Sequence, residues 1–428
     1  MMTEKKNYTL PIIMMILLFG MIAFVTNLAA PMGVVLKEQF GISNFLGMLG
    51  NAANFIAYAV MGIPGGILLT KYGYKKTALL AIAVGFLGVF IQYLSGYAGQ
   101  SSALGVYLLG AFVAGFSMCL LNTVVNPMLN TLGGGGNKGN QLIQVGGSFN
   151  SVMATFTPAF VGILIGEVAK ANIRDVFPVM YLAMAVFAVV FFVLWRVAIP
   201  EPHAEKASEP LKKLMLGALK FRHFVLGAIA IFVYVGVEVG TPGIMNLWLS
   251  ELPEVGKTTA GFVAGTYWLL MLAGRLTGAS IGGKVSSKTM LGVTSFTGLV
   301  LVSLAMFSPV TKLISLPVIQ TTAAGALSFG LAKVPINAMF IVLIGLCTSI
   351  MWGSIFNLAV EGLGKYLAAA SGLFMVLVCG GGILPAIQGK VADLAGFMPS
   401  YWVIFLGLAY LLFYALVGSK NVNKDIEV

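Results

Sequence analysis

We place two charged residues, Glu238 and Arg275, deep within apolar stretches of this chain. An ionisable group at bilayer depth costs roughly 2.5–3.5 kcal/mol on the insertion scale, unless it faces a partner or a watery cavity. Both residues are therefore functional candidates. Glu238 could bind hydroxyl groups or a coupling cation, with Arg275 biasing its ionisation. Alternatively, the two form a structural ion pair between neighbouring helices, or Arg275 belongs to a gate near the inner surface.

Uncharged polar and aromatic residues in apolar surroundings form a second group of candidates. Amide and hydroxyl groups both donate and accept hydrogen bonds, which suits a ligand rich in hydroxyls. Flat indole rings are a common lining of ligand pockets. Beside Glu238, the residues that we expect to bind such a ligand are Asn27, Asn54, Asn122, Asn126, Asn150, Tyr234, Trp268, Trp352 and Asn357, with Asn51 in similar surroundings. The alternative is structural, because asparagines in membranes also bond one helix to another.

The composition indicates that these residues are carried by membrane-spanning helices. The chain has 428 residues, of which 59% are hydrophobic and 9% charged, whereas a soluble domain carries about 25% charged residues. A bilayer-spanning helix needs about 20 apolar residues. We predict an all-α membrane protein with twelve transmembrane helices, at about 10–36, 45–69, 77–95, 104–131, 141–167, 176–199, 222–250, 258–282, 289–307, 336–360, 369–391 and 400–418.

The distribution of basic residues predicts the orientation of the helices. Lysines and arginines concentrate at the termini and in alternate loops, above all in the polar segment 200–221. Cytoplasmic loops of membrane proteins are rich in these residues, so we expect both termini in the cytosol. The net charge of +11 then reflects orientation and not binding to nucleic acid. The apolar run 10–30 is longer than a signal-peptide core of 7–15 residues, which favours an uncleaved first span.

Internal repetition predicts two related halves. The spacing of Gly66 from Lys76 in the first half equals that of Gly278 from Lys288 in the second. We therefore read residues 308–335 as an outer loop, with an interfacial helix as an option, and not as a thirteenth span. The predicted layout is two pseudo-symmetric six-helix bundles, 1–199 and 222–428, joined by a cytosolic linker, 200–221. Repeats of this kind are typical of transporters that bind substrate between the halves.

A short motif after the second predicted span supports this layout. Residues 65–76 read Gly-Gly-Ile-Leu-Leu-Thr-Lys-Tyr-Gly-Tyr-Lys-Lys. Small residues allow close helix approach, and the lysines hold the turn at the membrane surface. The segment resembles the cytosolic motif of the major facilitator superfamily, Gly-x-x-x-Asp-Arg/Lys-x-Gly-Arg-Arg/Lys. It departs from that motif at Thr70, where the family usually has Asp, and at Tyr74. The resemblance implies the major facilitator fold.

Longer stretches resemble the fucose:proton symporter family within this superfamily, and in particular its glucose/galactose and amino-sugar branch. They are Asn122–Pro127 with Ser148–Ser151, Tyr234–Val239, Ile355–Gly364 and Gly380–Pro385. The resemblance implies cation-coupled import of monosaccharides across a bacterial inner membrane. The chain departs from the fucose carrier at Ala30 and Asn122, where that carrier has acidic residues, and at Gly147, where it has glutamine. Alanine and an amide cannot exchange a proton, so the resemblance does not extend to proton coupling at Ala30 and Asn122.

We therefore predict a monomeric secondary carrier in the bacterial inner membrane that works by alternating access. Its substrate is a hexose, a deoxyhexose or an N-acetyl amino sugar, and its other partners are membrane lipids. We expect no cofactor and no metal site, while a proton, sodium or no cation accompanies the sugar. One alternative is an acidic sugar such as a sialic acid, or another organic anion, held by Arg275. Another is a membrane sugar sensor that does not transport. An enzyme is disfavoured because the spans carry no catalytic triad, paired carboxylates or metal cluster.

Overall fold

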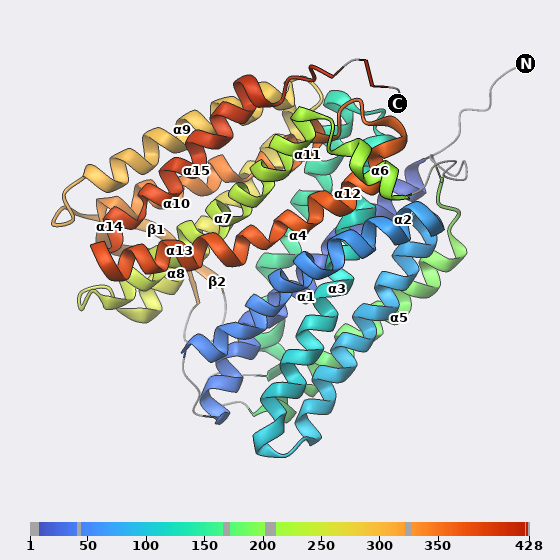
Figure 1. Cartoon of the computed structure of the whole chain (residues 1–428). Helices are drawn as coiled ribbons and strands as arrows, with labels where there is room; N and C mark the ends of the chain where they lie inside the picture. The colour runs from blue at the N-terminus through green and yellow to red at the C-terminus, as the bar shows by residue number, and fades with distance from the viewer. Residues whose placement is uncertain are drawn as a thin grey trace, which may run out of the picture. The chain divides into compact units, whose positions relative to one another are not determined.

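The computed structural model describes residues 8–40, 44–165, 172–201, 211–321, 327–423 and 425–426, and Figure 1 shows it to be built almost entirely of helices. Residues 202–210 of the linker lie outside the described residues, as does the N-terminal segment 1–7. The helices are α1 (Thr9–Phe40), α2 (Asn44–Leu94), α3 (Gln100–Leu132), α4 (Gly136–Ile165), α5 (Phe177–Arg196), α6 (Leu211–Ala218), α7 (Arg222–Glu251), α8 (Gly256–Ile281), α9 (Ser287–Phe307), α10 (Ile336–Thr348), α11 (Met351–Val360), α12 (Leu367–Val376), α13 (Gly380–Ala395), α14 (Phe397–Ser400) and α15 (Trp402–Phe413).

Within the described residues, these helices correspond to the twelve predicted spans. Helix α2 contains two spans, whereas α10 with α11, α12 with α13, and α14 with α15 form one span each, and α6 lies in the linker. Nine stretches of the described chain are long and apolar enough to cross a membrane. One of them, Ala53–Tyr97, holds two predicted spans, while α4 and α8 are not among the nine. Helix α8 carries many polar and small residues, which lowers its mean hydropathy. The reduced hydropathy of α8 thus coincides with the presence of Arg275.

A break at Gly73 separates the second and third predicted spans within α2. Gly73 has φ 80° and ψ 178°, a backbone conformation that side chains with a Cβ rarely adopt. The carboxylate of Glu201, beyond the end of α5, accepts hydrogen bonds from the backbone N–H groups of Tyr74 at 2.7 Å and Lys75 at 2.9 Å. Glu201 thus caps the N-terminus of the helix that resumes after the break.

The tenth predicted span is also broken, near its middle. Helix α10 ends at Thr348 and α11 begins at Met351. Hydroxyl groups there bond back to the preceding turn, since Thr348 Oγ1 donates toward Ile344 O at 3.3 Å and Ser349 Oγ to Leu346 O at 2.6 Å. Such bonds compete with the helical ladder and help to interrupt it. The interruption leaves backbone carbonyls that other groups can bind.

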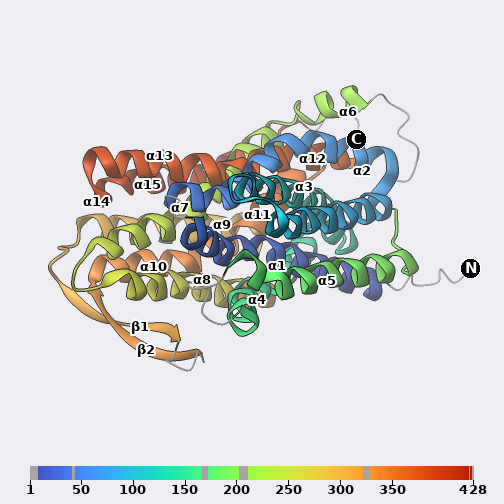
Figure 2. The same cartoon turned by 90° about the horizontal axis from the view of Figure 1, so that it is seen from below.

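Residues 308–335 do not cross the membrane as a helix, and the option of an interfacial helix is wrong. They form a hairpin of β1 (Leu313–Thr321) and β2 (Leu327–Pro335), antiparallel and in register from Leu313 opposite Pro335. Figure 2 shows the hairpin extending from the ends of α9 and α10 beside α8. Buried and exposed side chains alternate along the two strands, as expected for a hairpin with one covered face. Leu316, Val318 and Val334 are buried on one face, while Phe329 and Leu331 are exposed.

The chain divides into two compact units. Unit 1 contains Met1–Ala218 and Leu363–Val376, and unit 2 contains Leu219–Gly362 and Leu377–Glu427. Helix α12 therefore groups with the first six spans, although the sequence places it in the second half. Within unit 1, α12 packs against α2 with almost no side chain between the backbones. A Cβ at Gly372 would lie 2.5 Å from Cα of Gly66 and 2.6 Å from the carbonyl oxygen of Gly62.

Candidate functional site in the second unit

Glu238 of α7 and Arg275 of α8 form an ion pair in unit 2. Nη2 of Arg275 lies 3.1 Å from Oε1 of Glu238, and the two side chains are 12% and 13% exposed, respectively. The same carboxylate oxygen accepts a hydrogen bond of 2.9 Å from the hydroxyl of Tyr234, one turn earlier on α7. Oε2 has no hydrogen-bond partner among the described residues. The pair is neutral overall, and Oε2 can still accept a hydrogen bond.

Arg275 also bonds the break between α10 and α11. Its Nε donates to the carbonyl oxygen of Ser349 at 3.3 Å. Tyr267, two turns before Arg275 on α8, is fully buried and holds the same region, because its hydroxyl lies 2.9 Å from Thr348 Oγ1 and 3.3 Å from the backbone oxygen of Glu238. Irregular backbone at membrane depth is tolerated where protein or a cavity satisfies it. The carboxylate and the broken helix thus belong to one network.

Aromatic rings stand beside this network. The ring of Trp352 meets that of Tyr234 edge to face at a centroid distance of 6.3 Å. Trp268 meets Tyr267 in the same manner at 5.4 Å and is 41% exposed. Trp268 and Arg275 are seven residues apart on α8 and so lie on one face of that helix. The structure therefore brings five expected residues of unit 2 together, namely Tyr234, Glu238, Trp268, Arg275 and Trp352.

Asn357 is not part of this group. Its Nδ2 donates to Ser287 Oγ at 2.9 Å, at the first turn of α9. This contact joins α11 to α9, which is the helix-to-helix role considered above as the alternative for membrane asparagines.

In unit 1, two of the expected amides form a chain of hydrogen bonds between α2 and α3. Asn122 Nδ2 donates to the hydroxyl of Tyr58 at 2.7 Å, and Asn126 Nδ2 donates to the backbone oxygen of Asn122 at 2.8 Å. Asn54 lies one turn before Tyr58 on α2, and both side chains are buried. Asn54, Tyr58, Asn122 and Asn126 are thus neighbours on two packed helices.

Asn27 and Asn150 belong to a different pair of helices in that unit, α1 and α4. Asn27 Nδ2 donates to Ala23 O in its own helix at 2.8 Å, and Asn150 Nδ2 donates to Phe19 O across to α1, also at 2.8 Å. The bond from Asn150 ties α4 to α1. The side chains of Ala30 and Asn51 lie outside the described residues.

Three participants were not predicted from the sequence: Tyr58, Tyr267 and the Thr348–Ile350 break. Each carried a weak signal, since Tyr58 follows Asn54 at helical spacing, Tyr267 precedes Trp268, and Thr348 and Ser349 are adjacent hydroxyl residues in an apolar run. The part of the chain that the structure describes holds no cluster of His, Cys, Asp and Glu suited to a metal ion. The network in unit 2 offers hydrogen bonds and an aromatic face, and it suits binding rather than covalent chemistry.

Comparison with known proteins identifies the family. The family model described as Major Facilitator Superfamily matches residues 12–386. The chain belongs to the Major Facilitator Superfamily. This match confirms the resemblance seen in the motif at 65–76. The expected fold class of twelve helices is confirmed with it.

Relatives within the superfamily extend over nearly the whole chain. A glucose/galactose transporter of Brucella abortus is 29% identical, with 98% of this chain and 96% of the relative covered. An L-fucose-proton symporter of Escherichia coli is 23% identical, with coverage of 98% and 96%. These relatives agree with the resemblance to the fucose:proton symporter family.

Solved structures show the same fold. The fucose:proton symporter FucP of E. coli superimposes with a TM-score of 0.80 at 18% identity, covering 97% of this chain and 100% of that one. The proton:xylose symporter XylE gives a TM-score of 0.73 at 10% identity, covering 97% and 98%. Sequence identities this low establish only the fold, so the substrate has to be inferred from the site.

Proposed function

We propose that this superfamily member imports a neutral monosaccharide, such as a hexose, a deoxyhexose or an N-acetyl amino sugar, by alternating access. The observation that carries the proposal is the open oxygen Oε2 of Glu238 within a charge-balanced network. Sugar hydroxyls can donate to this oxygen, and the ring of Trp352 beside Tyr234 offers an apolar face to a pyranose. The relatives, a glucose/galactose transporter and an L-fucose-proton symporter, support the same substrate class.

The ion pair also favours a neutral ligand over an acidic sugar. Arg275 already binds the carboxylate of Glu238 and the carbonyl of Ser349. An anion bound there would compete with Glu238 for the guanidinium and would lie near a like charge. Desolvated charges of like sign repel strongly in low dielectric. We therefore place a sialic acid or another organic anion second to a neutral sugar.

We further propose that the protein works as a monomer in a bacterial inner membrane with both termini in the cytosol. The distribution of basic residues supports this orientation, and the relatives come from bacteria. Coupling to a cation is proposed through Glu238, because the first unit has Asn122 where the fucose carrier has an acid. A carrier without coupling would still move sugar down its gradient.

Flux through the purified protein tests the proposal. In proteoliposomes, radiolabelled galactose or glucose should enter, and unlabelled hexoses or N-acetylglucosamine should compete while sialic acid should not. Imposed proton and sodium gradients, applied one at a time, identify the coupling cation by accumulation above equilibrium. Competition by acidic sugars alone would favour the anion carrier. Binding of sugar without any flux would favour a sensor.

A further inference from the structure

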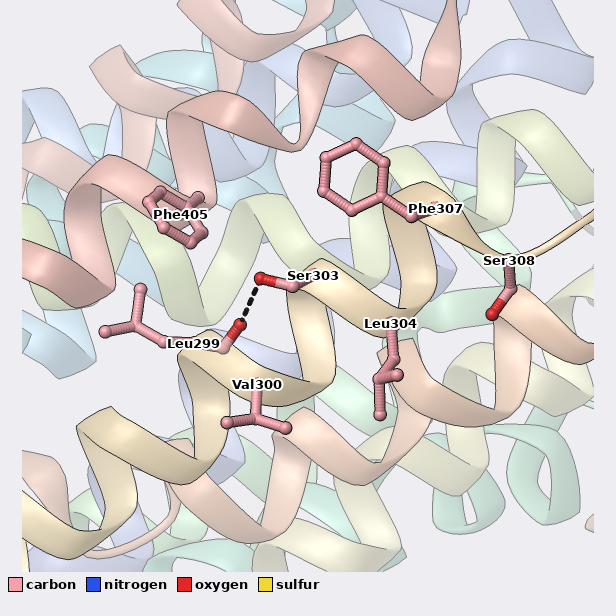
Figure 3. Close-up of a pocket in the computed structure, with 7 residues that line it drawn as sticks. All are labelled: Leu299, Val300, Ser303, Leu304, Phe307, Ser308 and Phe405. Atoms are coloured by element: carbon pink, nitrogen blue, oxygen red, sulfur yellow. Dashed lines mark hydrogen bonds between the residues drawn. The ribbon is translucent and has the colours of Figure 1, made fainter.

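A groove lies along one face of α9 in unit 2, apart from the network around Glu238. It has a volume of about 400 Å³. Residues of α9 and the position after it line the groove together with one residue of α15, and they are Leu299, Val300, Ser303, Leu304, Phe307, Ser308 and Phe405. Figure 3 shows the rings of Phe307 and Phe405 along one edge, with Val300 and Leu304 along the other. The groove is open, since Phe307 is 75% exposed.

Most polar groups of the groove already form hydrogen bonds within the protein. Ser303 Oγ donates to Leu299 O in its own helix at 2.8 Å, the bond drawn in Figure 3. At the end of α9, the carbonyl oxygen of Ser308 accepts a hydrogen bond from Asn337 Nδ2 at 2.9 Å, and Ala305 O accepts another at 2.6 Å. The remaining surface is hydrocarbon and aromatic, so a ligand of the groove must be apolar along its length.

The groove runs along two membrane spans and ends at an aromatic pair. Both α9 and the stretch that contains α15 qualify as spans. The rings of Phe307 and Trp402 meet at 6.4 Å where α9 ends and α15 begins. Trp residues are enriched at membrane–water interfaces, so the groove lies on the hydrocarbon side of this pair. Lys312 is exposed and lies at this end of α9, because its carbonyl oxygen accepts a hydrogen bond from the N–H of Ile336 at 2.8 Å, next to the Asn337 that bonds Ser308 O.

We propose that this groove binds one acyl chain of a membrane phospholipid, whose phosphate lies near Ser308 and Lys312. A flexible chain can fill an open concave surface lined by Leu, Val and Phe, and the ammonium group of Lys312 complements a phosphate. The lipid exchanges one hydrocarbon environment for another, so its retention depends on packing and on the headgroup contact. The bound lipid is expected to exchange more slowly than the bulk lipid while remaining removable by detergent.

Lipid retention by variants tests this site. The protein is extracted in native nanodiscs, transferred to mild detergent and analysed by native mass spectrometry. Wild type should retain one phospholipid. Ser303→Phe fills the groove and should lose at least about two thirds of the lipid-bound fraction. Val293→Phe adds the same ring to an exposed position of α9 outside the groove, and it should retain lipid as wild type does.

Two further variants control for loss of lipid through misfolding and test the contact with the lipid headgroup. Phe307→Ala removes one wall without adding volume, and Lys312→Gln removes the positive charge; each should lower retention, with the melting temperature unchanged. Equal lipid retention in Ser303→Phe and Val293→Phe would overturn the proposal. A wild-type dimer that Ser303→Phe converts to monomer would overturn it as well, because the occupant would then be a second copy of the chain.

Discussion

Arg275 uses one carboxylate oxygen of Glu238 and leaves the other open. Oε1 lies 3.1 Å from Nη2 of Arg275 and also receives the hydroxyl of Tyr234, while Oε2 has no partner among the described residues. Burying an unpaired carboxylate at membrane depth is costly, and the arginine offsets that cost. The arrangement therefore keeps a strong hydrogen-bond acceptor on a side chain that is only 13% exposed.

Glu238→Gln should abolish uphill sugar uptake in proteoliposomes. The amide keeps the size of the side chain but removes the negative charge, so the ion pair and any cation binding are lost together. Glu251→Gln serves as the matched control, because Glu251 is exposed at the end of the same helix. Accumulation by Glu238→Gln equal to that of the control would remove Glu238 from the transport mechanism.

The ion pair should show strong thermodynamic coupling. Either Glu238→Gln or Arg275→Met leaves a charged or polar partner poorly compensated, and each should lower stability by about 3 kcal/mol. The double variant removes both charges and should lose clearly less than the sum of the two single losses. Denaturant unfolding in detergent measures the three variants against wild type. Additive losses would show that the contact contributes nothing to stability.

Trp352 should contribute to sugar affinity through its ring. Trp352→Leu removes the aromatic face next to Tyr234, and the dissociation constant should rise about tenfold, which corresponds to about 1.4 kcal/mol. Trp195→Leu is the control, since Trp195 is exposed on α5 in the other unit. Calorimetric titration of the detergent-solubilised protein measures both. Equal affinities in the two variants would exclude Trp352 from the sugar site.

The sequence was sufficient to single out Glu238 and Arg275 as charged residues within apolar spans, but not to show which groups bind them. Glu238 and Arg275 could be identified because charged residues are scarce and costly in apolar spans. The break at Thr348–Ile350 could not, since two hydroxyl residues in an apolar run fit an unbroken helix equally well. Whether Asn357 bonds a ligand or Ser287 depends on which helix lies opposite, and spacing along one chain does not contain that information.

The hairpin at 313–335 shows a second limit of sequence reasoning. Short apolar runs fit a strand or a helix, and here Leu316 and Val318 alternate with exposed residues while Phe329 and Leu331 face outward on the partner strand. The expected absence of a thirteenth helical span was nevertheless correct, because it rested on the repeat between the halves. The assignment of α12 to unit 1 was not predictable, since close packing of glycines from distant segments leaves no local pattern.

The contact between α2 and α12 should tolerate no added methyl group. Gly372→Ala places a Cβ 2.5 Å from Cα of Gly66, so the two backbones must separate, at a cost of about 1–3 kcal/mol. Gly389→Ala is the matched control, because a Cβ there meets nothing closer than Ile244 Cδ1 at 3.9 Å. We expect a lower melting temperature and slower uptake for Gly372→Ala. A Gly372→Ala protein that behaves like Gly389→Ala would refute the close packing.

Glu201 should stabilise the start of the third span by satisfying two backbone N–H groups. Glu201→Ala leaves the N–H groups of Tyr74 and Lys75 without their acceptor, and capping substitutions of this kind cost about 0.5–2 kcal/mol. Glu201→Gln retains one side-chain oxygen and should lose less, which separates the hydrogen bonds from the charge. Glu254→Ala removes an exposed carboxylate elsewhere and should have no effect on stability. Thermal unfolding gives the melting temperatures of the three variants. If Glu201→Ala is as stable as Glu254→Ala, water replaces the capping carboxylate without loss of stability.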